Sequence, residues 1–202
     1  MGTRKALEPN VIPDAANIVA TFYSATDDDT AAGMGWYAMA HAQAARISGG
    51  NVETGAGVIA ALSPQIGWNE NVRIAGKAFA DDKASGQTTA NCVKADRIMF
   101  GYGAPLDVLG GNKVRAFYAA IVDPNHPTAV VVDRHAFDIA VGRVTDNATR
   151  GVLSRVGVYE LFADAYRQAA DILSAQFGTT ISPSAVQAVT WLAWRRMKGI
   201  VD

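Results

Sequence analysis

Apolar residues recur at helical spacing along most of the chain. Between Asp14 and Ser24, for example, they stand at positions 18, 19, 22 and 23, on one face of a helix. Alternating apolar and polar positions, which mark a half-buried strand, form no run of useful length. The pattern predicts an all-α fold of eight or nine helices with little or no sheet, near residues 14–24, 26–47, 54–62, 69–79, 92–100, 113–121, 134–141, 158–177 and 183–198.

Residues suited to helix ends flank several of these segments. Thr26-Asp27-Asp28-Asp29 puts negative charge where a helix N-terminus favours it, and the helix that it opens stops at Ser48-Gly49-Gly50. Ser182 and Pro183 suit the N-cap and the first position of the last helix. The segment 54–62 is apolar all round, which predicts a central buried helix.

The size and composition are those of a globular protein. A chain of 202 residues fits a single helical domain spanning 1–202, and 50% hydrophobic with 18% charged residues excludes a disordered chain. No run of 18 apolar residues occurs, and the first five residues lack the apolar core of a signal peptide. A lone cysteine, Cys92, excludes an internal disulfide and a cysteine-based zinc site. We expect a monomeric, cytoplasmic protein with no membrane partner.

The charge balance limits any interaction with nucleic acid. The formal net charge is −1, and the stretch from Lys94 to Arg150 holds seven basic and six acidic residues. DNA-binding proteins usually draw on a basic field. Any affinity for DNA is therefore expected to be modest and strongly dependent on salt.

Three short segments carry the candidate chemistry. Lys113 follows the turn Gly110-Gly111-Asn112 and opens an apolar-periodic helix. Asp133 stands 20 positions later (133 − 113 = 20), between the apolar run at 130–132 and the residues Arg134 and His135. That apolar run fits a short strand or a buried approach to a helix equally well. A third segment, Ser63-Pro64-Gln65, ends the central apolar helix.

In this order, the three segments resemble the helix-hairpin-helix DNA glycosylase superfamily, of the endonuclease III type. There, a Leu-Ser-x-Gln segment, a hairpin lysine and a Val-Asp-x-His aspartate surround an extruded nucleotide. The resemblance covers roughly residues 52–145, about half of the chain, as the catalytic core. The chain departs from the family in its hairpin, which reads Val108-Leu109-Gly110-Gly111-Asn112 instead of Leu-Pro-Gly-Val-Gly. It also lacks the four cysteines that hold the iron–sulfur cluster of many members.

The resemblance implies a role for each of these residues. Backbone N–H groups of Gly110, Gly111 and Asn112 would bind a DNA phosphate. Lys113 would attack the sugar as a nucleophile, and Asp133 would stabilise the charge that develops there or deprotonate the incoming amine.

Further DNA-binding roles follow from the same resemblance, again as expectations. Gln65 would fill the space that a flipped base vacates, and Trp68 or Tyr118 would stack on a base. Arg134 and His135 are expected to bind DNA beside them. No cofactor is expected, and no metal is assigned because the remaining histidines, at positions 41 and 126, have no partner histidine at ligand spacing.

Each of these residues also has an ordinary structural interpretation. Lys113 fits a solvated lysine in a first helical turn, Asp133 fits an N-cap, and His135 fits a packed histidine. Gln65 fits a turn residue. On the last helix a stripe of residues four apart, Gln187, Trp191 and Arg195, suits either the core or the wall of a substrate channel.

Three functions remain open on the sequence. The first is a DNA glycosylase, with possible lyase activity, that acts on a damaged or modified base. The second is a transferase on the same scaffold, which joins an amine or amino acid to a pyrophosphorylated hydroxymethyl pyrimidine in phage DNA; a phage-encoded enzyme would work in the host cytoplasm. The third is a helical DNA-binding protein without catalysis.

Overall fold

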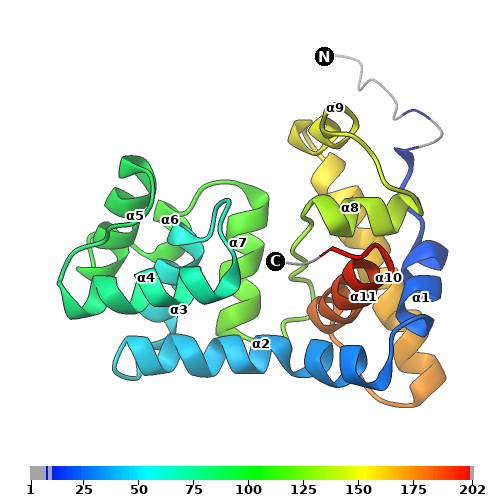
Figure 1. The fold of residues 1–202 in the computed structure, drawn as a ribbon, viewed down its shortest axis with the longest axis horizontal. Helices are drawn as coiled ribbons and strands as arrows, with labels where there is room; N and C mark the ends of the chain where they lie inside the picture. The colour runs from blue at the N-terminus through cyan, green and yellow to red at the C-terminus, as the bar shows by residue number, and fades with distance from the viewer. Residues whose placement is uncertain (1–7, 9–10, 201–202) are drawn as a thin grey trace. The chain divides into compact units, whose positions relative to one another are not determined.

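The computed structural model describes residue 8 and residues 11–200, and in this part of the chain it is all α-helical. Within these described residues, eleven α-helices form and no strand does, which confirms the predicted fold class. The helices are α1 (Ala15–Tyr23), α2 (Asp27–Ile47), α3 (Val52–Leu62), α4 (Trp68–Ala80), α5 (Thr89–Met99), α6 (Pro105–Val108), α7 (Asn112–Val122), α8 (Arg134–Val141), α9 (Asn147–Arg150), α10 (Val158–Phe177) and α11 (Pro183–Met197) (Figure 1). Across the described residues, no helix has both the length and the apolar character needed to span a bilayer.

The helices form two compact units. Of the described residues, the terminal unit comprises those up to 34 together with 132–200, and the central unit comprises residues 35–131. Helix α2 contributes its first residues to the terminal unit and the rest to the central unit. The single helical domain spanning 1–202 stays a prediction.

The central unit is built around α3. This helix packs against α4, α5, α6 and α7, and every residue from Gly55 to Leu62 is buried (Figure 1). The prediction of a central buried helix is confirmed, although α3 starts two residues earlier, at Val52. Asn51 caps it, because its side-chain oxygen accepts a hydrogen bond from Thr54 N at 3.1 Å.

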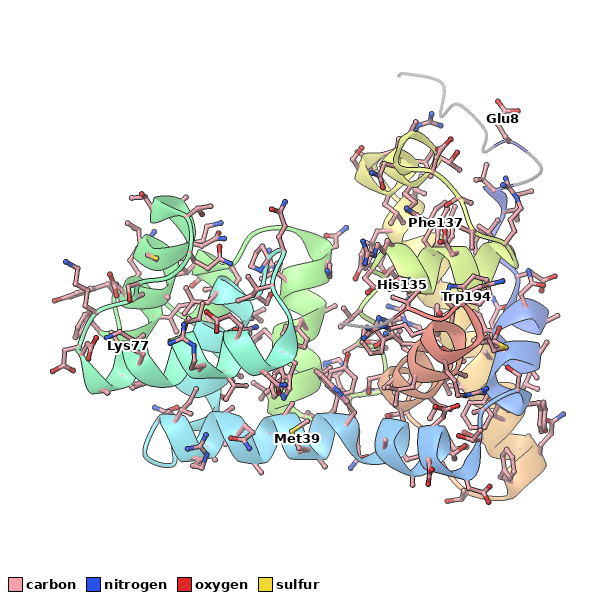
Figure 2. All side chains as sticks on the ribbon, in the orientation of Figure 1. Glu8, Met39, Lys77, His135, Phe137 and Trp194 are labelled. Atoms are coloured by element: carbon pink, nitrogen blue, oxygen red, sulfur yellow. The ribbon has the colours of Figure 1, made fainter. Side chains whose placement is uncertain are left out.

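The terminal unit has an aromatic core between α8, α10 and α11. Phe137 and Phe162 stack with ring centroids 4.4 Å apart, and the buried Tyr166 hydroxyl donates to the carbonyl of Ala136 at 3.2 Å. Figure 2 shows Phe137 and His135 on α8 and Trp194 on α11. These contacts hold α8 in place, and the residue that caps its N-terminus is Asp133, the candidate catalytic carboxylate.

Most helix ends lie close to the predicted positions. Thr26 and Asp29 form a reciprocal cap, in which each side chain accepts from the other's backbone N–H at 3.1 and 3.0 Å. Ser182 caps α11 as predicted, accepting from Ala185 N at 3.2 Å. Helix α5 begins at Thr89 instead of Cys92, because Thr88 accepts from the backbone N–H of Asn91 and caps the helix there.

The sequence missed two four-residue helices, α6 and α9, and the 3-10 turn Gly151–Ser154. One turn is too short to display a period, so no hydrophobic pattern marks it. The apolar run Val130–Val132 is a buried segment without regular secondary structure that leads into α8, which decides between the two structures that its sequence left open.

Candidate functional site

Asp133 is the N-cap of α8. Its Oδ1 accepts hydrogen bonds from the backbone N–H groups of His135 at 2.9 Å and Ala136 at 2.8 Å. The extended backbone of Asp133 (φ −95°, ψ −172°) turns the side chain back over the first helical turn. The structural interpretation of Asp133 as a helix cap is therefore confirmed, and capping leaves Oδ2 available for another partner.

That partner comes from the other end of the chain. Trp191 on α11 donates its indole Nε1–H to Asp133 Oδ2 at 3.1 Å. One turn further along α11, the Arg195 guanidinium lies over the indole ring, 4.3 Å from the ring centroid, as a cation–π pair. Both oxygens of Asp133 thus accept hydrogen bonds, and the donors come from two different helices.

His135 is the third member of this cluster and is packed inside it. The side chain is 7% exposed, and its ring meets Trp191 edge to face with centroids 6.1 Å apart and an interplanar angle of 79°. Its Nε2 accepts a hydrogen bond from Arg134 Nε at 3.1 Å. Burial lowers the pKa of His135 below its usual 6.5; the Asp133 carboxylate opposes this shift, while Arg134 and Arg195 add to it. The ring is therefore neutral at pH 7, with Nε2 as the acceptor and the proton on Nδ1.

Buried hydroxyl groups fix the backbone on either side of Asp133. The Tyr159 hydroxyl accepts a hydrogen bond from the backbone N–H of Val132 at 3.0 Å. Burial raises the pKa of Tyr159 and of Tyr166 well above the usual value for tyrosine, so both remain neutral hydrogen-bonding groups. The residue before Asp133 and the first turn after it are both held by tyrosine hydroxyls, since Tyr166 binds the carbonyl of Ala136.

The far end of α8 is anchored by a buried ion pair. The Asp138 carboxylate is 2% exposed and accepts from Arg150 Nε at 3.1 Å and Nη2 at 2.6 Å. The backbone N–H and hydroxyl of Thr145 also donate to it, at 3.2 and 2.5 Å. These bonds tie α8 to α9, so the helix that carries Asp133 is fixed at both ends.

The glycine turn lies in the central unit, where it joins α6 to α7. Gly111 has a positive φ of 78° and serves as the N-cap of α7 without any side-chain hydrogen bond to the helix. Gly110, Gly111, Asn112 and Lys113 are all exposed. The ammonium of Lys94, on α5, lies 4.0 Å from the point that a Cβ on Gly110 would occupy. The residues of the turn are therefore exposed, with the Lys94 ammonium beside Gly110 and Lys113 directly after the turn in the chain.

Gln65 lies in the loop between α3 and α4, and Trp68 follows that loop, also in the central unit. Gln65 is exposed and has a φ of 65°, a left-handed conformation that is uncommon for a residue with a Cβ. Trp68 is the first residue of α4 and is half-buried, with its ring centroid 5.0 Å from that of Trp36 and 6.5 Å from that of Phe117. Tyr118, the alternative stacking residue, is buried, and this burial raises the pKa of its hydroxyl.

The structure thus places the predicted residues in two groups. Asp133, Arg134 and His135 gather in the terminal unit, whereas Gln65, Trp68 and the segment 110–113 belong to the central unit. The predicted pairing of Lys113 with Asp133, and the DNA-binding roles of all these residues, stay predictions. Within the described residues, no group of three histidine, cysteine, aspartate or glutamate side chains is arranged to hold a metal ion.

Sequence reasoning did not assign three of the residues that the structure adds to these groups. Trp191 and Arg195 stood out only as a stripe of residues four apart, with no sign of what the stripe contacts. Lys94 gave no signal at all, because its position beside Gly110 depends on how α5 packs.

The protein is thus all-α in its described part, and in the terminal unit the Asp133 carboxylate is held between the N-terminus of α8 and the Trp191 indole. The chain belongs to DUF7178, a family of unknown function whose model matches residues 3–198. No curated protein and no solved structure matches it.

Proposed function

We propose that this protein is a DNA base-processing enzyme that resembles a glycosylase and acts on a flipped, modified or damaged base. The observation that carries the proposal is the Asp133 carboxylate, which accepts three hydrogen bonds, from two backbone N–H groups and one indole. A helix cap needs only one of its two oxygens, so the second contact suits a carboxylate held in a fixed orientation for chemistry.

The reaction that we propose uses Lys113 as the nucleophile. Its unprotonated amine would form a bond to the anomeric carbon of the nucleotide while the glycosidic bond breaks and the base leaves with the electron pair and takes up a proton. Opening of the sugar ring then gives a Schiff base between Lys113 and the deoxyribose. Asp133 would stabilise the positive charge that develops on the sugar as the base departs.

The glycine turn supports DNA as the substrate. Exposed N–H groups at the start of a helix are suited to a phosphate, and Gly110 and Gly111 allow close approach because they lack side chains. The ammonium of Lys94 adds positive charge at the same turn. This local charge offsets the near-neutral balance of the whole chain, since phosphate contacts depend on charge at the point of contact.

A second candidate is the transferase that joins an amine or amino acid to a pyrophosphorylated hydroxymethyl pyrimidine. The observation that favours it is the pair of guanidinium groups around His135: Arg134 Nε donates to His135 Nε2 at 3.1 Å, and Arg195 covers the Trp191 ring that meets His135 edge to face. Guanidinium groups bind phosphate oxygens well, so they suit a pyrophosphate leaving group. In this reaction the new bond joins the amine to the exocyclic carbon of the base, and pyrophosphate leaves with the electron pair.

One experiment distinguishes these reactions. DNA carrying hydroxymethyl, phosphoryl or amino-modified thymine is incubated with the protein, with and without amines and borohydride, and its nucleosides are then analysed by mass spectrometry. A glycosylase leaves abasic sites and forms an adduct with DNA that borohydride traps. The adduct should be lost in Lys113→Ala and retained in the control Lys77→Ala, which changes an exposed lysine on α4. A transferase adds mass to the base and gives no trapped adduct. No covalent change on any substrate refutes both enzyme proposals and leaves a DNA-binding protein.

A further inference from the structure

Both carboxylate oxygens of Asp133 accept hydrogen bonds, Oδ1 from the first turn of α8 and Oδ2 from an indole. Asp14 and Asp146 are also helix caps, and their Oδ1 atoms accept from the backbone N–H of Ala16 and of Thr149. Among the described contacts, neither of these two carboxylates is bound by an indole. The bond from Trp191 to Asp133 Oδ2 is therefore additional to what capping requires.

Trp191 is itself held on two sides. Arg195 covers the ring at 4.3 Å from its centroid, and the His135 ring meets it edge to face. The next residue along α11 after Arg195, Arg196, donates to Asp29 Oδ2 at 2.7 Å and to the carbonyl of Ser24 at 2.6 Å, which anchors the helix within the terminal unit. These contacts restrict rotation of the Trp191 ring, so its indole N–H donates to Asp133 from a fixed orientation.

We propose that Trp191 is a positioning residue for Asp133, whose indole N–H fixes Oδ2 while the first turn of α8 fixes Oδ1. The carboxylate is then held in one rotamer, so that its remaining lone pair, on Oδ2, has a fixed direction. The hydrogen bond between Trp191 and Asp133 is part of the geometry of the terminal unit. Its effect on turnover rests on the proposed function.

This arrangement makes asparagine a poor replacement for Asp133. Asparagine has one acceptor oxygen, whereas the site presents donors to both oxygens of residue 133. If the amide oxygen caps α8, the amide NH2 group faces the Trp191 N–H, and two donors oppose each other. Trp191→Phe removes the indole donor and keeps an aromatic ring between Arg195 and His135, so it should relieve the conflict.

The test of the contact is a double-mutant cycle on the protein without DNA. We expect Asp133→Asn to lower the folding equilibrium constant on the order of ten-fold more in the wild-type background than in Trp191→Phe, since a hydrogen bond to a charged group contributes about this much. Asp146→Asn provides the matched control, because Asp146 is an exposed cap without a tryptophan, and its effect should be the same in both backgrounds. Additive effects of Asp133→Asn and Trp191→Phe would overturn the proposal.

Nuclear magnetic resonance gives a second readout that does not depend on stability. The indole N–H signal of Trp191 should be protected from hydrogen exchange and should shift in Asp133→Asn, whereas the signal of Trp194, on the same helix, should stay in place. An unchanged Trp191 signal in Asp133→Asn would contradict the hydrogen bond between Trp191 and Asp133.

Turnover tests the positioning role on the substrate identified by mass spectrometry. We expect Trp191→Phe to lower kcat on the order of ten-fold with little change in KM, because an oriented carboxylate matters in the transition state more than in substrate binding. Trp194→Phe should change neither constant. An unchanged kcat in Trp191→Phe refutes positioning. If the wild-type protein processes no DNA, the proposed function fails by itself, and the cycle and the indole signal decide whether Trp191 holds Asp133.

Discussion

Adding one methyl group at Gly55 should destabilise the central unit, although alanine is the better helix former. Gly55 lies on α3 where this helix passes the end of α2. A Cβ there would lie 2.8 Å from the carbonyl carbon of Ala44, nearer still to its oxygen, and 2.9 Å from Ser48 Oγ. Ordinary van der Waals contact of a Cβ begins at 3.4 Å, so the two helix backbones would have to move apart.

The magnitude follows from two opposing effects. Replacing glycine by alanine inside a helix stabilises it by about 1 kcal/mol. Overpacking costs about 1–3 kcal/mol, and the cost here lies near the upper end because the atoms met first are backbone that cannot rotate away. The Ser48 hydroxyl also donates to the carbonyls of Ala44 and Asn51 at 2.7 and 2.6 Å, and the added methyl group would disturb both bonds. We expect a net loss of about 2 kcal/mol for Gly55→Ala.

Gly76→Ala on α4 is the matched control, with the opposite sign. Its Cβ would lie 3.6 Å from Ile47 Cγ2, which is an ordinary contact, so the helix propensity gain of about 1 kcal/mol should be realised. Thermal unfolding followed by circular dichroism should show a Tm lowered by about 4–8 °C for Gly55→Ala and raised by about 2–4 °C for Gly76→Ala. A Gly55→Ala protein as stable as the wild type would refute the close approach of α2 and α3.

Three further predictions concern the surroundings of the candidate site. Asp138→Ala should lower the free energy of unfolding by about 3–5 kcal/mol in chemical denaturation, because Arg150 and Thr145 lose their buried acceptor; a loss below about 1 kcal/mol contradicts this. Because burial lowers the pKa of His135, the unfolded chain binds this proton more readily. The free energy of unfolding should therefore fall as pH drops from 6.5 through the lowered pKa of His135. His135→Gln should make the free energy of unfolding less dependent on pH in this range. Gln65→Gly should raise the Tm, because glycine adopts the positive φ at this position without strain; an unchanged or lower Tm argues against strain there.

The helices themselves could be predicted because their signals are local. The nine long helices follow from apolar spacing, and the predicted caps at Thr26 and Ser182 depend on residues within three positions of each helix start. The two four-residue helices could not be predicted in this way, because a single turn shows no periodicity.

The candidate site was only partly within reach of the sequence. Asp133 was identified as a carboxylate at a helix start, and the structure confirms that position. Its hydrogen bond to Trp191 could not be predicted, because the two residues stand 58 positions apart in the sequence. The stripe of residues four apart on the last helix also does not reveal which helix it faces. The buried state of His135 depends in the same way on the packing of α11 against α8.

By itself, the sequence determined the all-α class, the approximate positions of the long helices and the chemical groups at the starts of α7 and α8, since backbone hydrogen bonds and caps form between near neighbours. Only the tertiary structure decided that Lys94 lies beside Gly110, that Arg150 neutralises Asp138, and that an indole completes the hydrogen bonding of Asp133. These contacts join residues from different helices. They form because close packing of buried apolar faces brings particular side chains together, and no local pattern records that choice.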